Sequence, residues 1–467
     1  MDVSYDLAEN VASTKFDDLP KKTVEITKNS IIDILSCILA SSTQAPECQE
    51  VVEIVREGGG KKESTILVFS DRIPCHMAAL ANGAMAHALD YDDVVDETGV
   101  HPSTTTVPPA FALAERLGNV DGKKFITAVA VGNDLVCRLG ACLAPEKFEF
   151  RPATTLGIFS AVGTSGSMLG LDQEKIVDAM GIAFHCGASG TFEAFYSPGA
   201  TIRGLYGGTI SWLGVMSALM AQRGIAGIKS SLEGKAGLFN LYFGGKYSRE
   251  TLVSELGKKF RGEDVCFKPW PTTRTTHAHI EAALALSKEY NLDPENITEI
   301  TASVAGLTRG FCEPLEARQR PKTSLDAKAS LPFMIATSIA RRKVTISDLT
   351  PQAITDPVSL RLAKKVTHKF DPKLETGAKV PPGILEIKTK GGKVYSKQVN
   401  FALGHPRNPV NWETLAVKFR DCASYSKINI PEKDIDKVLQ LVRNLEELED
   451  VSQIIRLLST DQARDKL

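Results

Sequence analysis

The chain has 467 residues, of which 43% are apolar and 24% are charged, so it is long enough for two folded domains and too apolar to be disordered. Its 55 lysines and arginines balance its 56 aspartates and glutamates, which gives a formal net charge of −1. Nucleic-acid-binding proteins usually carry a basic excess, so this balance argues against that class.

The N-terminal segment and the cysteines bear on localisation. The segment MDVSYDLAEN is acidic and lacks the pattern of a signal peptide. The longest early apolar stretch, Ile31 to Ala40, contains Asp33 and is too short to cross a bilayer. The nine cysteines stand singly, without a CxxC pair, so neither a disulfide framework nor a structural zinc site is expected. We therefore expect a cytoplasmic protein without a membrane segment.

The first half of the chain has the apolar spacing of helices, from Val24 to Ile38 and again from Phe125 to Val136. Asp134 and Arg138 are four residues apart, which predicts an ion pair on one helix face. The stretch from Gly157 to Gly170 is rich in small residues. It lacks the nucleotide-binding patterns GxGxxG and GxxxxGK[ST], so it predicts close contact between helices instead.

The pattern changes near Cys266. Residues 296–304 are rich in Ile, Thr and Val, as in a strand, and residues 383–401 form two alternating runs around Gly391 and Gly392, as in a hairpin. Helical spacing returns from Ile435 to Leu448. The expected fold class is mainly α with an α+β insertion. A helical domain would cover residues 1–265, an α+β domain residues 266–400, and a return to the helical domain residues 401–467.

The densest polar cluster is AHALDYDDVVDETGVHPS, residues 86–103. His87 and Asp90 are three residues apart, which predicts that they share a helix face. Gly99 and Pro102 interrupt the helix before and after His101. The ionisable residues of the cluster are His87, Asp90, Asp92, Asp93, Asp96, Glu97 and His101.

Three interpretations of this cluster compete. Its carboxylates could hold a divalent metal ion, which prefers oxygen ligands. It could be a solvated acidic helix end without a function. It could also be an acid–base site, in which a carboxylate orients an imidazole that transfers protons near neutral pH. The composition of the cluster does not choose among them.

The cluster lies within a run, ANGAMAHALDYDD followed by HPSTTTVPPAFALAE, that resembles the signature of the MmgE/PrpD family. Three further segments resemble family elements in the family's order: VCFKPWPTTRTTH (residues 265–277), SLDAKASLPF (residues 324–333) and LGHPRNPVNWETLAVKF (residues 403–419). The resemblance extends over nearly the whole chain. It implies a helical domain, a smaller α+β lid domain, a homodimer, and no organic cofactor or metal.

The family includes 2-methylcitrate dehydratase, cis-aconitate decarboxylase and iminodisuccinate epimerase. The resemblance therefore implies catalytic roles for Asp90, His101 and Lys268. We expect His101 to transfer the proton and Asp90 to fix its tautomer. Asp92 and Asp93 either orient His101 or face water. His277 is either a substrate-binding residue or a hydrogen-bonded core histidine.

Three positions, in two of the family's elements, depart from the family pattern. Arg151 stands where relatives have the histidine of H-P-[PT], and Arg203 and Tyr206 replace the lysine and histidine of K-x-[LM]-H-x-G. Arginine stays protonated and its planar fork suits a carboxylate, but it is a poor proton shuttle. We therefore expect Arg151 and Arg203 to bind substrate, together with Asp93, Tyr206 and His277, unless the arginines are ordinary surface residues.

The resulting prediction is a cofactor-independent lyase, with a dehydratase favoured, that acts on a small di- or tricarboxylic acid. A decarboxylase or an epimerase of a dicarboxylate is the alternative among enzymes of this family. Two alternatives come from other classes: a non-catalytic carboxylate-binding protein, and a metal hydrolase that uses the aspartate cluster.

Overall fold

A computed structural model describes the whole chain except residues 144–151, 188–189, 191–192, 194–199, 377–379 and 460–467. The chain divides into two compact units. Unit 1 comprises Met1–Val265 and Asn411–Leu467, and unit 2 comprises Cys266–Val410. The predicted fold class, a mainly helical chain with a smaller α+β part, is confirmed.

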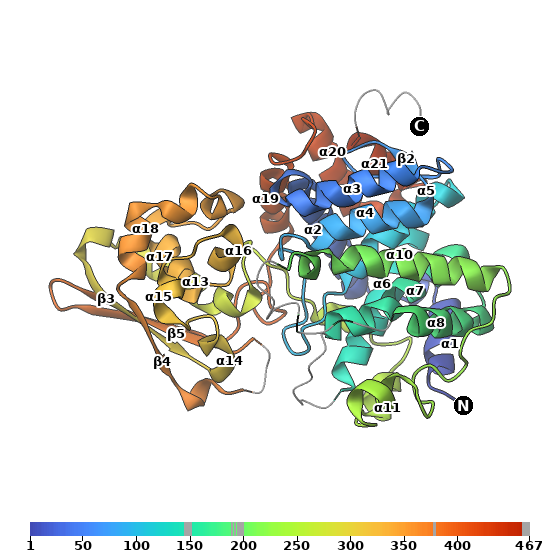
Figure 1. Cartoon of the computed structure of the whole chain (residues 1–467), viewed down its shortest axis with the longest axis horizontal. Coiled ribbons are helices and arrows are strands. Elements are labelled where there is room, and N and C mark those ends of the chain that lie inside the picture. The colour runs from blue at the N-terminus through green and yellow to red at the C-terminus, as the bar shows by residue number, and fades with distance from the viewer. Residues whose placement is uncertain (144–151, 188–189, 191–192, 194–199, 377–379, 460–467) are drawn as a thin grey trace. The chain divides into compact units, whose positions relative to one another are not determined.

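In the described residues of unit 1, the helices are accompanied by one small hairpin (Figure 1). The hairpin pairs β1 (Ser64–Thr65) with β2 (Arg72–Ile73). The helices before the boundary at Val265 are α1 (Ser4–Ser13), α2 (Lys21–Gln44), α3 (Pro46–Gly58), α4 (Cys75–His87), α5 (Val107–Leu117), α6 (Gly122–Ala141), α7 (Pro152–Leu169), α8 (Gln173–Gly187), α10 (Ile202–Gln222), α11 (Leu238–Phe243) and α12 (Arg249–Val253). Short 3-10 turns η2 (Ser103–Thr105) and η3 (Arg261–Asp264) belong to the same unit.

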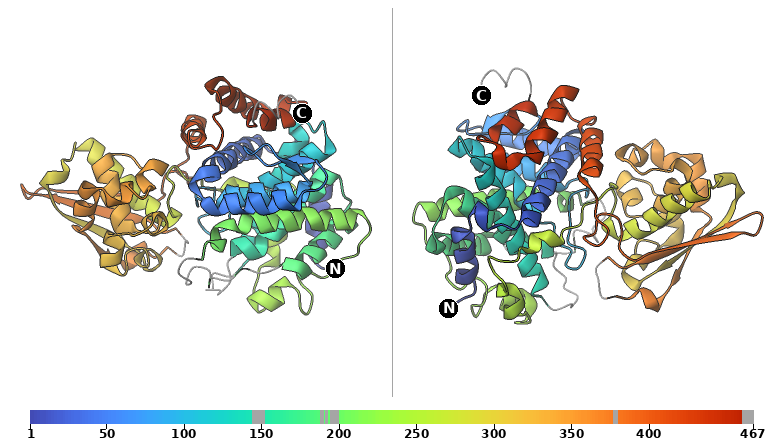
Figure 2. Two further views of the ribbon diagram at one scale, coloured as in Figure 1. Left: turned by 45° about the horizontal axis from the view of Figure 1, so that its top comes forward. Right: turned by 180° about the vertical axis from the view of Figure 1, so that it is seen from behind.

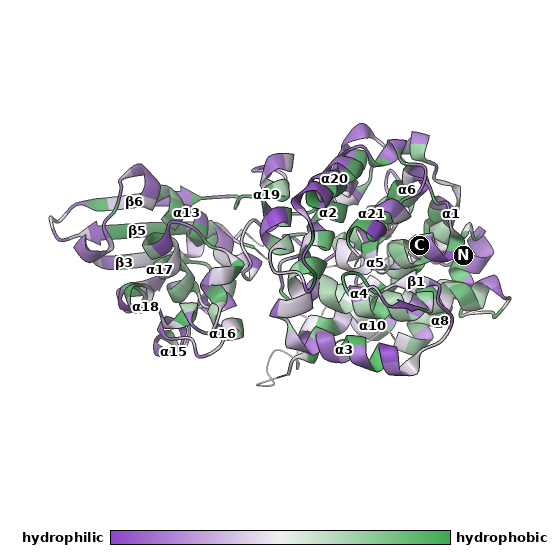
Figure 3. Cartoon of the chain, turned by 90° about the horizontal axis from the view of Figure 1, so that it is seen from above, coloured by the Kyte–Doolittle hydropathy of each residue, from purple (hydrophilic) through white to green (hydrophobic). Residues whose placement is uncertain are grey.

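The return segment adds α19 (Trp412–Ala423), α20 (Glu432–Arg443), η9 (Leu445–Glu447) and α21 (Ser452–Leu457) to unit 1. The side chain of Asn411 accepts a hydrogen bond from the Thr414 amide at 2.9 Å, so α19 begins where unit 1 resumes. α19 packs on α2, and the red return helices lie beside the blue N-terminal ones in Figure 2. α20 is largely hydrophilic in Figure 3 and buries its apolar face, which includes Val438 and Val442.

Helices in unit 1 approach closely through small residues. Every residue of α2 from Ile31 to Ser42 is buried. The stretch from Gly157 to Gly170 lies mainly in α7, where a Cβ added at Gly157 would sit 3.2 Å from the Ile210 side chain of α10. The predicted close contact between helices is therefore confirmed, and no nucleotide loop forms in the part of this stretch that the structure describes.

Unit 2 is built on a four-stranded sheet in the order β4-β3-β5-β6. The strands are β3 (Ile297–Val304), β4 (Val366–Phe370), β5 (Gly383–Thr389) and β6 (Val394–Val399). β3 runs parallel to β4 and antiparallel to β5, and β5 and β6 form the predicted hairpin. The predicted strand over residues 296–304 is β3, so both strand predictions are confirmed.

Helices cover one face of this sheet (Figure 2). α13 (His277–Glu289) packs on β5 and β6, and α17 (Leu331–Arg341) packs on α13. The shorter helices of unit 2 are α14 (Gly306–Arg309), α15 (Leu315–Gln319), α16 (Ser324–Lys328) and α18 (Pro357–Ala363). Among the helices that the structure describes, none is long and apolar enough to span a bilayer.

Candidate active site

The predicted site segment follows α4 through a sharp turn. α4 ends at His87, the Asp90 amide donates to the His87 carbonyl at 2.7 Å, and Asp90 has a left-handed backbone with φ of 52°. Aspartate tolerates this conformation better than most residues do. The prediction that His87 and Asp90 share a helix face is therefore wrong, because the helix ends before Asp90 and the chain reverses there.

This reversal brings Asp92 between two imidazoles. Nδ1 of His87 lies 2.9 Å from Oδ1 of Asp92, and Nδ1 of His101 lies 2.9 Å from Oδ2. The hydroxyl of Thr104, in η2, donates to the same Oδ2 at 2.6 Å. All four residues are buried, and Asp92 is fully so. The carboxylate thus has three side-chain donors in place of water.

The charge of Asp92 fixes the tautomers of both histidines. Burial alone would raise the pKa of this carboxyl, but His87 and His101 beside it hold its pKa well below the usual range. An ionised carboxylate only accepts hydrogen bonds, so Nδ1 of each histidine must carry a proton. A neutral imidazole then has its lone pair on Nε2. Both rings are therefore oriented to exchange protons through Nε2 and to be stabilised by Asp92 once protonated.

The ring of Tyr206 packs against the imidazole of His87. The two ring centroids are 4.4 Å apart, and the His87 and His101 centroids are 4.8 Å apart in an edge-on arrangement. Tyr206 can lie this close because α4 and α10 meet at glycines: a Cβ added at Gly207 would lie 2.5 Å from the Gly83 carbonyl oxygen. The prediction that Tyr206 binds substrate remains a prediction; its ring packs against His87.

Asp93 points into the body of unit 1. Its carboxyl accepts hydrogen bonds from the Ser30 hydroxyl of α2 at 3.1 Å and from the Ser103 amide at 3.2 Å, and it bonds the Ser103 hydroxyl. Burial, and next the charge of Asp33, raise its pKa to about 7. Asp93 therefore ties the site segment to α2 and η2, and its substrate-binding role remains a prediction.

Of the other predicted site residues, Asp90 belongs to the same segment, whereas Arg151, Arg203 and Lys268 lie elsewhere in the chain. Asp90 is half-buried in the turn after α4, and Arg203 is half-buried in the first turn of α10. Arg151 lies outside the described residues. Lys268 belongs to unit 2, where it is buried in the segment before α13. Their predicted roles in catalysis and carboxylate binding stay predictions.

His277, the first residue of α13, is held within unit 2. The Arg274 guanidinium lies 3.2 Å from its Nδ1, and a guanidinium can only donate, so Nδ1 accepts. Nε2–H then donates to the Thr272 carbonyl at 3.3 Å. The imidazole is thus neutral in this arrangement and links Arg274 to the Thr272 carbonyl. The prediction that His277 binds substrate stays a prediction.

The same segment also has the donors of a cation site. His87, Asp90, Asp92 and His101 each offer one ligand atom, and these atoms lie within 4.8 Å of one another. Imidazole nitrogens and carboxylates suit several divalent transition metals. In the structure, Nδ1 of each histidine bonds Asp92, so a cation held through either Nδ1 would have to replace that hydrogen bond.

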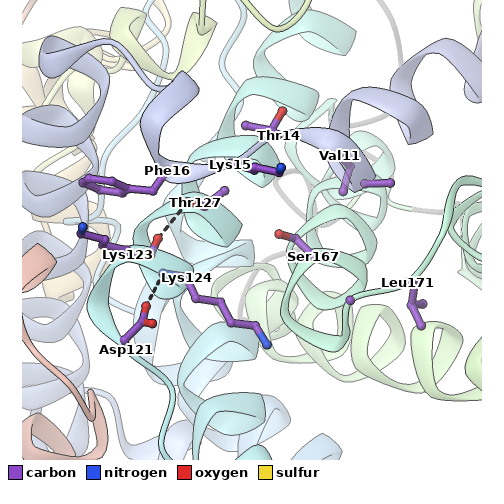
Figure 4. Close-up of a pocket in the computed structure, with 12 residues that line it drawn as sticks. Val11, Thr14, Lys15, Phe16, Asp121, Lys123, Lys124, Thr127, Ser167 and Leu171 are labelled. Atoms are coloured by element: carbon purple, nitrogen blue, oxygen red, sulfur yellow. Dashed lines mark hydrogen bonds between the residues drawn. The ribbon is translucent and has the colours of Figure 1, made fainter.

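A separate pocket of about 270 Å³ lies in unit 1 among α1, α6 and α7 (Figure 4). Asp121 caps α6 there by accepting from the Lys124 amide at 2.8 Å, and Thr127 donates to the Lys123 carbonyl at 2.8 Å. These contacts stabilise the start of α6. None of the described residues that line it is a predicted site residue, so the candidate site is a different place.

Two family models match the chain: the MmgE/PrpD N-terminal domain over residues 5–250, and the MmgE/PrpD C-terminal domain over residues 270–446. The chain belongs to the MmgE/PrpD family. This confirms the resemblance found in the sequence. The MmgE/PrpD N-terminal match includes α4, Asp92 and both imidazoles, so the candidate site lies within the family's own domain.

Curated relatives in the MmgE/PrpD family are similar over nearly the full length. The chain is 26% identical to the cis-aconitate decarboxylase of Mus musculus, over 99% of this chain and 95% of the relative. It is 25% identical to that of Homo sapiens, over 98% and 94% respectively. It is 23% identical to that of Aspergillus terreus, over 97% and 94%.

Proposed function

We propose that the chain is a lyase that acts on a small di- or tricarboxylic acid. The observation that carries this proposal is the buried Asp92 carboxylate with an imidazole on each side, in a chain of the MmgE/PrpD family. The arrangement supports proton transfer at neutral pH, because Asp92 orients both rings and stabilises the imidazolium that forms. The names of the relatives support a carboxylate substrate.

In the proposed reaction, His101 exchanges a proton with the carbon next to a substrate carboxylate through Nε2. We assign binding of the substrate carboxylates to Arg151, Arg203 and Lys268. Their fixed positive charges would also stabilise the negative charge that develops in the transition state. We assign Asp90 a catalytic role at the reacting centre, as the resemblance to the family implies. The roles of Asp90 and Lys268 rest on the family pattern, whereas those of Arg151 and Arg203 rest on the affinity of a guanidinium for carboxylates.

Dehydration is the reaction that the two imidazoles favour. It needs a base that removes a proton from carbon and an acid that protonates the hydroxide as the carbon–oxygen bond breaks. His101 and His87, both oriented through Nδ1, supply one group for each step. Decarboxylation is the second candidate, favoured by the names of the relatives. There the carbon–carbon bond breaks, carbon dioxide leaves, and only a proton donor to the resulting carbanion is required.

The test is a proton NMR screen of polycarboxylic acids with four to seven carbon atoms in deuterated water. Dehydration gives an unsaturated product that keeps every carbon of the substrate, decarboxylation gives a product that lacks one carboxyl group, and epimerisation gives a stereoisomer with deuterium at the inverted carbon. We expect turnover by the wild-type chain, and a fall of roughly 100- to 10,000-fold in a folded His101→Gln variant. Undiminished turnover by that variant would exclude His101 as the proton-transferring residue.

Two further measurements in the same screen distinguish a lyase from a metal hydrolase and from a non-catalytic carboxylate-binding protein. Activity that survives a chelator would argue against a metal hydrolase, whereas activity lost to the chelator and restored by a divalent cation would favour one. Substrate line broadening without turnover would indicate a carboxylate-binding protein instead of an enzyme. We further propose a homodimer, and light scattering on the purified chain measures its mass.

A further inference from the structure

The loop that carries Asp90, Asp92 and Asp93 has Tyr91 at its centre, and a buried lysine holds that residue. Nζ of Lys418 donates to the Tyr91 carbonyl at 2.6 Å and lies 3.6 Å from the centroid of the Tyr91 ring. Lys418 belongs to α19, the first helix of the return segment. Residues 327 positions apart in the sequence are thus joined at the residue that precedes Asp92.

The same ammonium is paired with an acid of α2. Nζ of Lys418 lies 2.7 Å from Oδ1 of Asp33, and both residues are buried. Burial alone would lower the pKa of Lys418, but Asp33 and nearby groups raise it, so the lysine stays charged. A buried ammonium is costly unless its donors are satisfied. Here a carboxylate, a carbonyl and an aromatic face replace water.

The position of Asp92 is therefore fixed through hydrogen bonds to both of its sequence neighbours, Tyr91 and Asp93. Lys418 holds the Tyr91 carbonyl on one side, and on the other Ser30 and Ser103 hold the Asp93 carboxyl. Ser30 and Asp33 lie one turn apart on α2, so one helix supports both contacts. A shift of Tyr91 would move Asp92 and, with it, the hydrogen bonds to His87 and His101.

We propose that Lys418 is a positioning residue of the candidate site, which keeps Asp92 in register with the two imidazoles by holding Tyr91. Its effect on turnover rests on the proposed function. Its effect on the imidazoles does not, because Asp92 fixes their tautomers with or without substrate.

Lys28 provides a matched control. It is also buried and also joins α2 to the return segment, through hydrogen bonds to the Arg443 carbonyl at 2.8 Å and to Glu446 at 3.1 Å. Its third partner is Glu25 of α2, at 2.7 Å. These partners lie outside residues 90–93, so the loss of Lys28 tests stability without touching the loop.

The test compares Lys418→Met/Asp33→Asn with Lys28→Met/Glu446→Gln. Each double variant removes a lysine together with an acid partner, and removing both charges of a buried pair is tolerated far better than removing one. Histidine nitrogen NMR reports the tautomers of His87 and His101 in each folded variant. An Asp33→Asn single variant separates the loss of the lysine from the loss of its partner.

We expect the Lys418 variant to shift the His87 and His101 nitrogen signals, and the Lys28 variant to leave them unchanged. On a substrate found by the screen, kcat should fall roughly 10- to 100-fold with little change in KM, because a small misplacement slows chemistry more than binding. Unchanged imidazole signals in the Lys418 variant would overturn the proposal. So would an equal shift in the Lys28 variant, or the full effect in Asp33→Asn alone. A wild-type chain without lyase activity would defeat the proposed function but not this one.

Discussion

Nδ1 of His101 lies 2.9 Å from Oδ2 of Asp92. The sequence pattern assigned the orientation of His101 to Asp90, whereas the carboxylate that bonds its Nδ1 in the structure is that of Asp92. The same carboxylate bonds Nδ1 of His87. One buried charge therefore controls two imidazoles, and removing it should affect both at once.

We expect Asp92→Asn to change the tautomer of at least one histidine. An amide offers one acceptor and one donor, so the ring that faces its NH₂ group must accept through Nδ1 and carry its proton on Nε2. Activity should fall by about 100- to 10,000-fold, since that Nε2 no longer accepts a proton. Histidine nitrogen NMR checks the tautomers. The comparison variant is Asp90→Asn, which should leave both tautomers as they are, and the opposite pattern would return the orienting role to Asp90.

Asp93 predicts a measurable dependence of stability on pH. Its pKa is raised from 3.8 to about 7 by burial and by the charge of Asp33. The folded chain keeps this proton over a range where the unfolded chain has lost it. The stabilisation is complete below about pH 4 and is lost as the pH rises through 7. The difference corresponds to at most about 4 kcal/mol of unfolding free energy.

We expect Asp93→Asn to remove this part of the pH dependence. Denaturant unfolding of both proteins between pH 4 and 8 measures it, and the difference between the two curves isolates Asp93 from other groups that titrate. The wild-type free energy of unfolding should fall relative to that of the variant as the pH rises. Parallel curves would show that Asp93 titrates alike in the folded and unfolded chains.

Much of the fold could be predicted because local patterns decide it. The hairpin of β5 and β6 follows from alternating residues around two glycines, and α6 follows from its apolar spacing. The ion pair between Asp134 and Arg138, four residues apart, also forms as expected, at 2.7 Å. In these cases neighbours in the sequence are neighbours in space.

The candidate site was less predictable because its geometry depends on one backbone conformation and on distant contacts. Spacing cannot show that Asp90 adopts a left-handed backbone and turns Asp92 toward His87. Nor can spacing show that Lys418 holds Tyr91, the residue between Asp90 and Asp92. The presence of His87 in the same polar cluster was the available signal, but its partner was not apparent until the chain was folded.

Gly207 predicts a stability cost that reaches the site. In a Gly207→Ala variant, the new Cβ would lie 2.5 Å from the Gly83 carbonyl oxygen and 2.6 Å from a methyl carbon of Thr104. α4 and α10 would have to separate, at a cost of roughly 1–3 kcal/mol. Because Tyr206 precedes this residue, its ring should move away from His87. Thermal unfolding and the His87 ring signals in NMR measure the two effects.

The matched variant is Gly204→Ala on the same helix. Its Cβ would meet Ala88 at 3.5 Å, which is ordinary contact. Alanine is a better helix former than glycine by about 1 kcal/mol, so this variant should be as stable as the wild type or slightly more so. Equal destabilisation of both variants would indicate that the close approach of α4 and α10 at Gly207 is not what limits this position.

Arg138 links α6 to the segment that leads out of unit 1. Its guanidinium is buried, donates to Asp134 at 2.7 Å and donates to the carbonyls of Leu252 at 3.1 Å and Ser254 at 2.7 Å. Arg138→Met would leave the buried Asp134 without its counter-ion and the carbonyls without a donor. We expect a loss of about 3–5 kcal/mol in the free energy of unfolding, measured by denaturant titration. Adding Asp134→Asn removes the uncompensated charge and should recover part of that loss, whereas a double variant no more stable than Arg138→Met would place the cost in the carbonyl contacts instead.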